Sequence, residues 1–469
     1  MNRAIVGLGI LGCFALMGVA ILMASQLGDL DPALGDLDPA LIFGGMLIII
    51  FLVVSAIWAP HVGLAIALIF LLNNYYLDMY APPKFSPFLA TLAALCLVAI
   101  LRFALGYNHK VSIDIKISAS LAGFCSWSFL YALARFGEFP ISAFLHLAVP
   151  LFIFLIFIQL MQQRQTVIWA FYGLLVGYII FCVLMLPDLY YGSTHISGGY
   201  FNTEMFRGED RRLHYTSIAW ILNVGATLCL GFVIRGSRLN KIVGVALYAL
   251  IAATALLTFA RGAPVGLGAG LLAICVVMAK QKNYRALIFV SVMAVFFLIL
   301  YLGSPMWLWV YEYKTIQREI TLVGQSRFWL AYDGIISIAL HPLLGRGGGG
   351  SPTHSYLLDI PWQYGIPAAL VFYYAILRLW VRSWRLATSP PSPADSRFDQ
   401  ALKLGCFLAF CVSIVQGIFD PVLHTPFYAI IFWLLRSIET YYWGRQQLEA
   451  PTPQAHKSLY ESRSQPIDS

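Results

Sequence analysis

The sequence predicts an all-α, polytopic membrane protein whose helices cross the bilayer about 12 to 14 times. Its 469 residues are 60% hydrophobic and only 11% charged, with a mean hydropathy of +0.77. A water-soluble enzyme is excluded, because a soluble fold cannot bury so much apolar surface. The apolar residues also come in runs of roughly 17 to 24 residues, which is the length that a helix needs to cross the hydrocarbon core of a bilayer.

The predicted spans follow one another along most of the chain. They lie at residues 4–27, 41–59, 61–76, 86–106, 115–134, 139–160, 166–187, 214–235, 240–259, 263–279, 286–303, 361–382, 401–418 and 424–442. The run at 61–76 is short and the last two runs are closely spaced, which explains the range in the predicted count. The first run follows Arg3 and lacks a convincing small-residue cleavage site, so we predict a retained anchor and not a signal peptide.

Two long outer loops interrupt the spans, at 188–213 and 304–360. Within the second, residues 311–340 combine helical apolar spacing with exposed charges, which predicts short helices on or near the membrane face. Residues 383–400 are predicted to form a Pro/Ser-rich cytoplasmic loop. The predicted segments are N-terminal helices (1–187), core helices with an arginine-bearing outer loop (188–303), a long periplasmic loop (304–360), C-terminal helices (361–445) and a disordered cytoplasmic tail (446–469).

The distribution of Lys and Arg predicts the orientation. With both termini in the cytoplasm and the spans alternating in direction, 20 of the 30 Lys and Arg residues fall on the cytoplasmic side, as the positive-inside rule requires. The other ten comprise eight arginines and only two lysines. This bias points to an anionic ligand on the outer side, because a guanidinium pairs with phosphate oxygens through a planar fork of donors that lysine lacks.

The sequence contains no pattern typical of a bound metal or a disulfide. All eight cysteines fall within predicted spans, and none has the spacing of a metal-ligand set. We therefore expect no metal and no cofactor. We expect the lipid bilayer, and not nucleic acid, as a partner.

Two arginine-bearing places at the outer ends of spans are candidates for binding, since ionisable groups near a membrane usually face a cavity or a partner. In GYFNTEMFRGEDRRLHYTS, Arg207 and Arg211 crowd against acidic neighbours. A solvated, self-paired cluster is the alternative there. In LLTFARGAPVG, Arg261 stands alone in a compact turn between two spans. Snorkelling to the surface is the alternative for Arg261.

A third place is the polar stretch HPLLGRGGGGSPTHSYLLD, residues 341–359, in which Gly345 and Gly347–Gly350 lie within six positions. It is either a slack linker or a shaped loop, because glycine permits backbone conformations that other residues resist. His354 follows the glycines and precedes an apolar helix. Imidazole suits proton abstraction near neutral pH, although a histidine in a loop is often merely exposed.

Three segments resemble the signature of the O-antigen ligase and O-antigen polymerase superfamily. The block GQSRFWLAYDGIISIALHPLLGRGGGGSPTHSYLLDIPWQYGI is similar to its His-Pro-Leu-Leu-Gly-x-Gly motif, followed by a His and an apolar helix. FARGAPVGLGAG looks like its Ser-Arg-Gly span start, and FRGEDRRLHYTSIA like its Arg-x-x-Gly loop before Asn-Pro-Asn-x-x-Ala. The likeness covers roughly residues 200–375. Ser355 stands where Asn is commoner, Ala260 replaces Ser, and His214-Tyr215-Thr216 replaces Asn-Pro-Asn.

The resemblance implies a metal-independent, inverting membrane glycosyltransferase of the GT-C kind. Carried over to this sequence, His354 is the catalytic base, while Arg207 and Arg261 hold a pyrophosphate and Arg327 is a further contact. Arg211 and Arg346 complete the predicted substrate-binding set. His341 is expected to end a helix and is the weaker candidate for catalysis.

The resemblance also implies partners and a location. The donor is a glycan on undecaprenyl pyrophosphate, the acceptor is another glycan or the lipid A core, and the site faces the periplasm at a bacterial inner membrane. A chain-length regulator or other proteins of the assembly pathway are possible partners. Three functions stay open: a polymerase, which the many outer arginines slightly favour, a ligase that transfers to lipid A core, and a transporter of lipid-linked oligosaccharides without chemistry.

Overall fold

The computed structural model describes the chain in several stretches. These are residues 59–73, 115–136, 154–194, 215–258, 262–303, 327–346, 355–419 and 426–449, with single positions at 91, 94, 95, 97–99, 102, 260 and 353. Every regular element in them is an α-helix. Six of these helices are long and apolar enough to cross a membrane. The protein is therefore an all-α, multi-pass membrane protein, as the sequence predicts.

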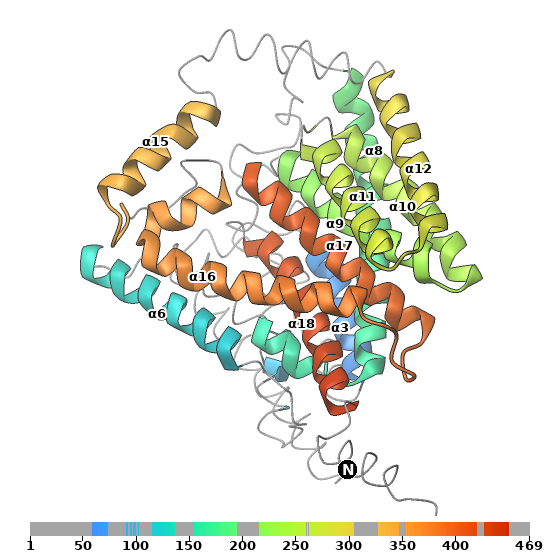
Figure 1. Ribbon diagram of the computed structural model, residues 1–469, viewed down its shortest axis with the longest axis horizontal. Helices are drawn as coiled ribbons and strands as arrows, with labels where there is room; N and C mark the ends of the chain where they lie inside the picture. Colours follow the sequence, from blue (N-terminus) through green and yellow to red (C-terminus); the bar gives the residue numbers. More distant parts are fainter. Residues whose placement is uncertain are drawn as a thin grey trace, which may run out of the picture. The chain divides into compact units, whose positions relative to one another are not determined.

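Most of the observed helices overlap predicted spans, whereas the helix at Arg327–Leu340 lies in the predicted outer loop at 304–360. The observed helices are α3 (Pro60–Leu72), α6 (Ile115–Phe136), α8 (Arg164–Thr194), α9 (Tyr215–Arg235), α10 (Arg238–Leu257), α11 (Gly262–Lys280), α12 (Tyr284–Leu302), α15 (Arg327–Leu340), α16 (Tyr356–Thr388), α17 (Arg397–Phe419) and α18 (Pro426–Glu449) (Figure 1). The predicted span at 4–27 lies outside the described residues, as does nearly all of 41–59. The predicted spans at 86–106 and 139–160 are described only in part.

The chain forms two compact units, residues 1–108 with 163–184 and residues 109–162 with 185–469. In the first unit, α3 packs against the first part of α8. The backbone of Ala65 lies so close to Gly173 that a side chain there would collide with it, and Asn73 Nδ2 donates a hydrogen bond to the Gly177 carbonyl (3.2 Å). Small residues bring these two helices together, as is usual in membrane bundles.

The core of the second unit is a bundle in which α9 packs against α10, α11 and α17 (Figure 1). A Cβ atom on Gly231 of α9 would lie 2.6 Å from the backbone nitrogen of Gly405 on α17, so the two helices touch through their backbones. Most of α9 and α17 is buried, whereas α10 exposes large apolar residues such as Leu239 and Ile242. The interior of the unit therefore lies along α9 and α17, and α10 presents an apolar surface suited to lipid.

A second part of the same unit is built around α16, which packs along α6 and against α15 (Figure 1). The rings of Phe124 on α6 and Phe372 on α16 lie 4.9 Å apart. The helix α15 confirms the helical prediction for the later part of 311–340, and the residues before Arg327 in that segment lie outside the described part. Its exposed residues include Trp329, Tyr332 and Leu340, which form an apolar stripe at helical spacing.

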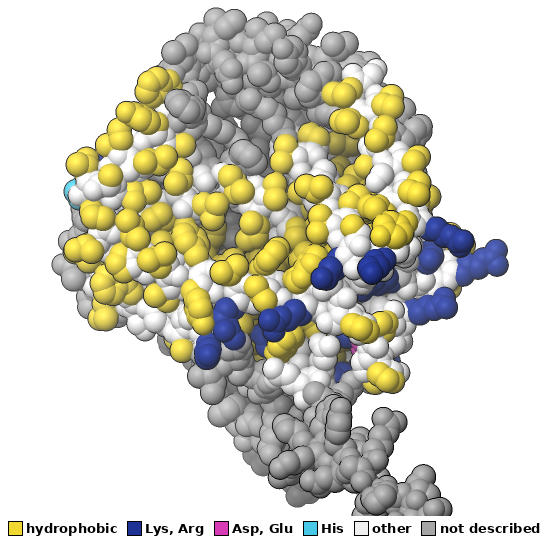
Figure 2. Space-filling model, in the orientation of Figure 1, with side chains coloured by type: hydrophobic (Ala, Val, Ile, Leu, Met, Phe, Trp, Pro, Cys, Tyr) yellow, Lys and Arg dark blue, Asp and Glu magenta, His cyan; other side chains and the backbone are white. Residues whose placement is uncertain are grey.

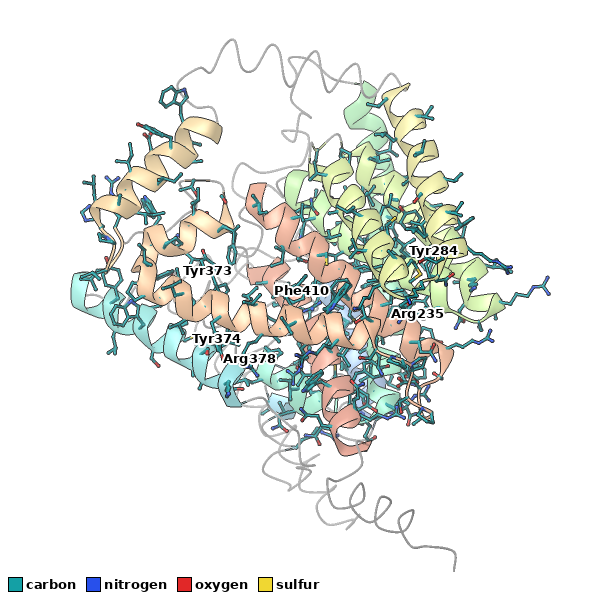
Figure 3. The ribbon with its side chains drawn as sticks, viewed as in Figure 1. Arg235, Tyr284, Tyr373, Tyr374, Arg378 and Phe410 are labelled. Carbon is teal, nitrogen blue, oxygen red and sulfur yellow. The ribbon has the colours of Figure 1, made fainter. Side chains whose placement is uncertain are left out.

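The helix α16 is kinked and begins earlier than the predicted span at 361–382. Gly365 has φ 82°, and the helix also contains Pro361 and Pro367. Because Pro361 has no N–H, the Leu357 carbonyl loses its helical donor, and the hydroxyl of Tyr373 donates to it instead at 2.5 Å (Figure 3). The sequence-based boundary was wrong because this tertiary hydrogen bond lets the helix start before its proline.

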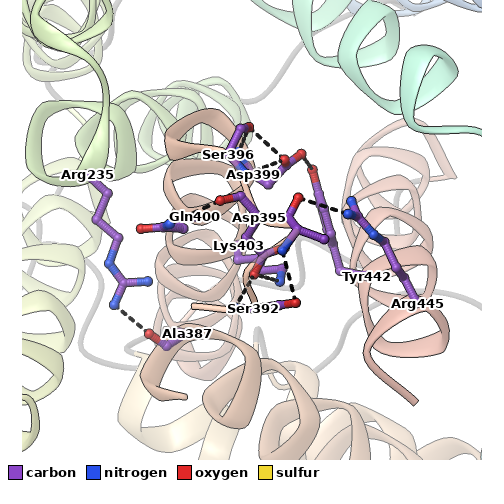
Figure 4. Close-up of polar contacts among 11 residues, drawn as sticks. Arg235, Ala387, Ser392, Asp395, Ser396, Asp399, Gln400, Lys403, Tyr442 and Arg445 are labelled. Atoms are coloured by element: carbon purple, nitrogen blue, oxygen red, sulfur yellow. Dashed lines mark hydrogen bonds and ion pairs between the residues drawn. The ribbon is translucent and has the colours of Figure 1, made fainter. Parts of the chain in front are cut away.

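The ends of α9, α11 and α16 that are predicted to face the cytoplasm lie together. Arg235 Nη2 donates to the Ala387 carbonyl at 2.7 Å (Figure 4). Gln281 Nε2 donates to the same carbonyl at 3.3 Å. Exposed basic side chains gather at one end of the apolar surface in Figure 2, and Arg238 and Lys280 are among the exposed residues of the adjoining helix ends. The ends of these helices therefore carry basic residues on the surface of the second unit.

The predicted loop at 383–400 is shorter than expected. The helix α16 runs on to Thr388, and α17 begins at Arg397, so that only residues 389–396 are non-helical. Asp395 in this loop lies 2.6 Å (Oδ2) from Lys403 Nζ on α17, and Tyr442 on α18 donates to Asp399 in the first turn of α17 at 2.8 Å (Figure 4). The Pro/Ser composition suggested a longer loop, but helix stops only at Ser389, which precedes Pro390.

The helix α18 carries a buried ion pair between Arg436 and Glu439. Arg436 Nη1 lies 2.5 Å from Glu439 Oε2, and neither side chain is accessible to solvent. Arg436 Nη2 also donates to the Cys406 carbonyl (2.8 Å), and its guanidinium carbon lies 4.0 Å from the centroid of the Phe410 ring (Figure 3). Ser383 donates to the same carboxylate. Such partners are needed because a buried charge without them is very costly.

Candidate functional site

The backbone on either side of His354 is held by one buried carboxylate. His354 itself lies outside the described residues, but its neighbours Thr353 and Ser355 are only 2% and 8% exposed. Asp359, in the first turn of α16, accepts hydrogen bonds from the N–H (3.1 Å) and the hydroxyl (2.7 Å) of Thr353. The N–H of Ser355 donates to the Thr353 hydroxyl oxygen (3.2 Å). The chain at these two neighbours is therefore shaped, not slack.

Asp359 occupies a favourable position for this role. The side chain is 0% exposed, and its acidic group stands in the first turn of α16, where the helix dipole stabilises negative charge. Its own N–H donates to the Ser355 carbonyl at 2.8 Å, which starts the helix directly behind the loop. The same few residues therefore begin the helix and fix the loop.

The segment that leaves α15 is tied to the kink of α16. The N–H of Arg346 donates to the Trp362 carbonyl (2.7 Å), and the N–H of Ile366 donates to the Pro342 carbonyl (2.8 Å). These bonds use backbone groups that the kink at Gly365 releases from the helix. The loop that carries His354 therefore starts and ends against the first segment of α16.

Two glycines make this close crossing possible. Gly345 and Gly365 have φ angles of 69° and 82°, in the region that favours glycine. A Cβ atom on Gly365 would collide with the Leu343 carbonyl group, and one on Gly345 would lie 2.6 Å from the Gly365 nitrogen. Of the glycines in the stretch 341–359, Gly345 therefore serves a defined turn. Gly347–Gly350 lie outside the described residues.

Side chains of α6 and α15 complete the support of this turn. Tyr131 donates from its hydroxyl to the Gly345 carbonyl, and Trp127 Nε1 donates to the Tyr364 carbonyl, both at 3.2 Å. On α15, Gly334 lies so close to the Thr353 side chain that a Cβ atom would collide with it. The helices α15 and α16 therefore contact Thr353, the residue before His354, and α6 supports the turn at Gly345 and Tyr364.

The turn that carries Arg261 is anchored separately. Arg261 also lies outside the described residues, but the carbonyl of Gly262 accepts hydrogen bonds from Gln416 Nε2 (3.0 Å) and Asn223 Nδ2 (3.3 Å). On the other side, the N–H of Ala260 donates to the Thr258 hydroxyl oxygen (3.3 Å). The turn is thereby joined to α9 and α17.

The flanks of Arg261 and of His354 meet the same turn of α17. Gln416 binds the Gly262 carbonyl, and a Cβ atom on the next residue, Gly417, would lie 3.7 Å from the Tyr356 side chain at the start of α16. Two segments far apart in the sequence, each bearing a predicted functional residue, are therefore fixed to neighbouring positions of one helix.

The structure describes less of the remaining predicted site residues. Arg207 and Arg211 lie outside the described residues. Arg327 begins α15, and only its backbone is described. Arg346 is exposed, and its guanidinium carbon lies 6.0 Å from the centroid of the Trp362 ring. Arg346 is thus the one predicted binding arginine whose side chain is described, and it stands at the start of the loop that leads to His354.

Sequence reasoning missed the residues that support the site. Asn223 and Gln416 could have been found, because uncharged polar side chains inside apolar spans must satisfy their hydrogen bonds within the protein. Asp359 had a similar signal, since it is acidic and lies between His354 and an apolar helix. Trp127 and Tyr131 gave no signal, because aromatic residues are common in any span.

No protein-family model matches the chain, and no curated protein sequence matches it. Among the described residues, no group of three or more His, Cys, Asp or Glu side chains is arranged to hold a metal ion. The class that the fold defines is a multi-pass helical membrane protein, with two candidate functional segments fixed to one helix.

Proposed function

We propose that the protein transfers a glycan from undecaprenyl pyrophosphate to an acceptor sugar hydroxyl, as a polysaccharide polymerase of the O-antigen kind. The observation that carries this proposal is that the segments flanking Arg261 and His354 both meet α17, at Gln416 and Gly417. A reaction that removes a proton from one reactant and leaves negative charge on the other needs a base and a cation, and His354 and Arg261 belong to segments whose flanks meet neighbouring positions of α17.

The proposed reaction is a single displacement. The acceptor hydroxyl oxygen bonds to the anomeric carbon of the donor glycan, the bond from that carbon to the pyrophosphate oxygen breaks, and undecaprenyl pyrophosphate leaves. His354 takes the hydroxyl proton as the bond forms. Attack opposite to the leaving group inverts the configuration of the anomeric carbon.

The arginines supply the positive charge for the leaving group. Arg261 would form paired hydrogen bonds to the pyrophosphate, because its planar guanidinium matches two phosphate oxygens at once. Arg207, Arg211, Arg327 and Arg346 are the further candidates for this contact. Donors held in advance where charge develops stabilise a transition state better than solvent does, and the anchored turn before α11 is consistent with such a fixed donor.

The orientation of the helices supports a periplasmic site. The helices α11 and α16 each have one end at the basic cluster around Ala387 and the opposite end near Gln416 and Gly417. The positive-inside rule assigns the basic end to the cytoplasm. The candidate site would then open on the periplasmic face of a bacterial inner membrane, where lipid-linked glycans are expected by the resemblance.

The acceptor decides between the proposed polymerase and its alternatives. Purified protein in lipid nanodiscs would be given only carrier-linked repeat units, and the products would be separated by size. A ladder of longer carrier-linked glycans supports the polymerase, since donor and acceptor are then the same kind of molecule. Transfer that requires added lipid A core would identify a ligase. Unchanged substrate in both conditions, with folded protein, would contradict glycosyl transfer and leave transport.

A further inference from the structure

Two uncharged polar side chains form a bridge in the interior of the bundle. Asn223 of α9 and Gln416 of α17 are 0% and 1% exposed, and Asn223 Nδ2 lies 3.1 Å from Gln416 Oε1. Both also donate to the Gly262 carbonyl, and Asn223 donates to the Ala263 carbonyl (3.1 Å). Three helices therefore meet at one cluster of amide and carbonyl groups at the start of α11.

The bridge is not needed to complete the hydrogen bonding of α11. Carbonyl groups in the first turn of a helix accept hydrogen bonds from N–H groups one turn further along, so the amides of Asn223 and Gln416 add donors to groups that already have a helical partner. Asn223 Oδ1 is buried and has no hydrogen-bond partner among the described residues. An apolar pair would fill the same space without this cost.

The cluster occupies a specific place relative to the candidate site. Arg261 is the residue directly before Gly262, and a Cβ atom on the residue after Gln416 would lie 3.7 Å from the side chain of Tyr356, two residues after His354. Gly266 leaves room for the bridge, since a Cβ atom there would lie 2.6 Å from Gln416 Oε1. Gln416 therefore contacts the residue that directly follows Arg261.

We propose that Asn223 and Gln416 are positioning residues that hold the turn carrying Arg261 for pyrophosphate binding. This inference rests on the proposed function, because it assigns the two amides a role in the same site. They act through Arg261 and do not touch the substrate. The chemical class of the ligand is the pyrophosphate group of a polyprenyl carrier.

A double-mutant cycle on binding tests the proposal without relying on turnover. The affinity for undecaprenyl pyrophosphate without a glycan would be measured for wild-type protein, Gln416→Met, Arg261→Ala and the double variant. We expect Gln416→Met to weaken binding about tenfold in the wild-type background and less than about twofold in the Arg261→Ala background. Met nearly matches the volume of Gln, so the thermal unfolding temperature should stay close to that of wild type.

A second variant and two controls keep the outcome clear. Asn223→Leu removes the partner amide on α9. Its effect on carrier affinity should likewise be large in the wild-type background and small in the Arg261→Ala background. Thr227→Val and Ser413→Ala change buried polar residues one turn away on α9 and α17. In the described part of the chain their hydroxyl groups donate to carbonyls of their own helices, and the two variants should leave binding unchanged. If Gln416→Met is unstable, Asn223→Leu alone carries the cycle.

The possible failures are distinguishable. The positioning role would be overturned if Gln416→Met and Asn223→Leu weakened carrier binding by the same factor with and without Arg261→Ala. It would also be overturned if these variants bound the carrier as well as the two controls do. The polymerase proposal would stand in both cases. If wild-type protein does not bind undecaprenyl pyrophosphate, the proposed function itself fails, and the positioning role fails with it.

Discussion

Asp359 accepts two hydrogen bonds from Thr353, one from its backbone N–H at 3.1 Å and one from its hydroxyl at 2.7 Å. The carboxylate stands at the start of α16, and the residue that follows Thr353 is His354. A helix terminus thus fixes the backbone next to the proposed base. The precision of a catalytic group depends on such supporting contacts as much as on the group itself.

Two replacements of Asp359 should distinguish the role of its side chain as a hydrogen-bond acceptor from the effect of its negative charge. Asp359→Ala leaves the buried N–H and hydroxyl of Thr353 without their acceptor, which we expect to cost about 1–3 kcal/mol of unfolding free energy and to reduce glycan transfer. Asp359→Asn keeps an oxygen that can accept both bonds and should retain more activity. Thermal unfolding and turnover would be compared with Asp333→Ala, an exposed carboxylate on α15. Equal behaviour of Asp359→Ala and Asp333→Ala would contradict the anchoring role.

Gly365→Ala should disrupt the turn that precedes the His354 loop. The φ angle of 82° disfavours alanine by about 1 kcal/mol or more, and the new methyl group would collide with the Leu343 carbonyl. We expect a lower unfolding temperature and loss of transfer. Gly123→Ala on α6 is the matched control, because a Cβ atom there meets nothing within 4 Å. A Gly365→Ala protein as stable and active as this control would rule out the proposed crossing.

Apolar run length predicted most of the described helices because crossing a bilayer imposes a strict length on each one. The span from 240 to 259, for example, appears as α10 (Arg238–Leu257). The early start of α16 escaped prediction because Tyr373 compensates for Pro361 from more than three turns away. The burial of Arg436 escaped it as well, since its partner Glu439 and the Phe410 ring come together only in the packed bundle.

The candidate site was predictable in its parts but not in its assembly. The sequence singled out Arg261 and His354 as residue types suited to pyrophosphate binding and proton transfer. The segments that carry them both meet α17 at Gln416 and Gly417, which lie beyond both segments in the chain. No sequence pattern encodes these contacts. Long-range contacts of this kind follow from packing, whereas motifs report only local chemistry.

Arg261→Lys should be nearly as harmful as Arg261→Ala. If Arg261 forms paired hydrogen bonds to the pyrophosphate, the ammonium group of lysine restores the charge but not the planar geometry. We expect each variant to lower carrier affinity about tenfold or more. Binding of undecaprenyl pyrophosphate to the two variants measures this directly. Wild-type affinity in Arg261→Lys would instead indicate an arginine that extends to the membrane surface and binds no ligand.

Chelation should not slow the reaction. The proposed charge on the leaving group is met by arginines, and the acidic residues nearest to Arg207 and Arg211 in the sequence, Glu204, Glu209 and Asp210, lie among these arginines in the chain. Turnover of purified protein would be followed with and without EDTA. Activity that falls with EDTA and returns with Mg²⁺ or Mn²⁺ would show that a metal ion, and not the arginines alone, supports the pyrophosphate.

Substitution of His354 tests the central claim most directly. Purified wild-type protein, His354→Ala and His341→Ala would be given carrier-linked repeat units, with the unfolding temperature and carrier affinity measured on the same samples. The account predicts that His354→Ala binds the carrier normally but transfers glycan about 100- to 10,000-fold more slowly, while His341→Ala, an exposed histidine at the end of α15, keeps its activity. Wild-type product from folded His354→Ala protein would contradict it.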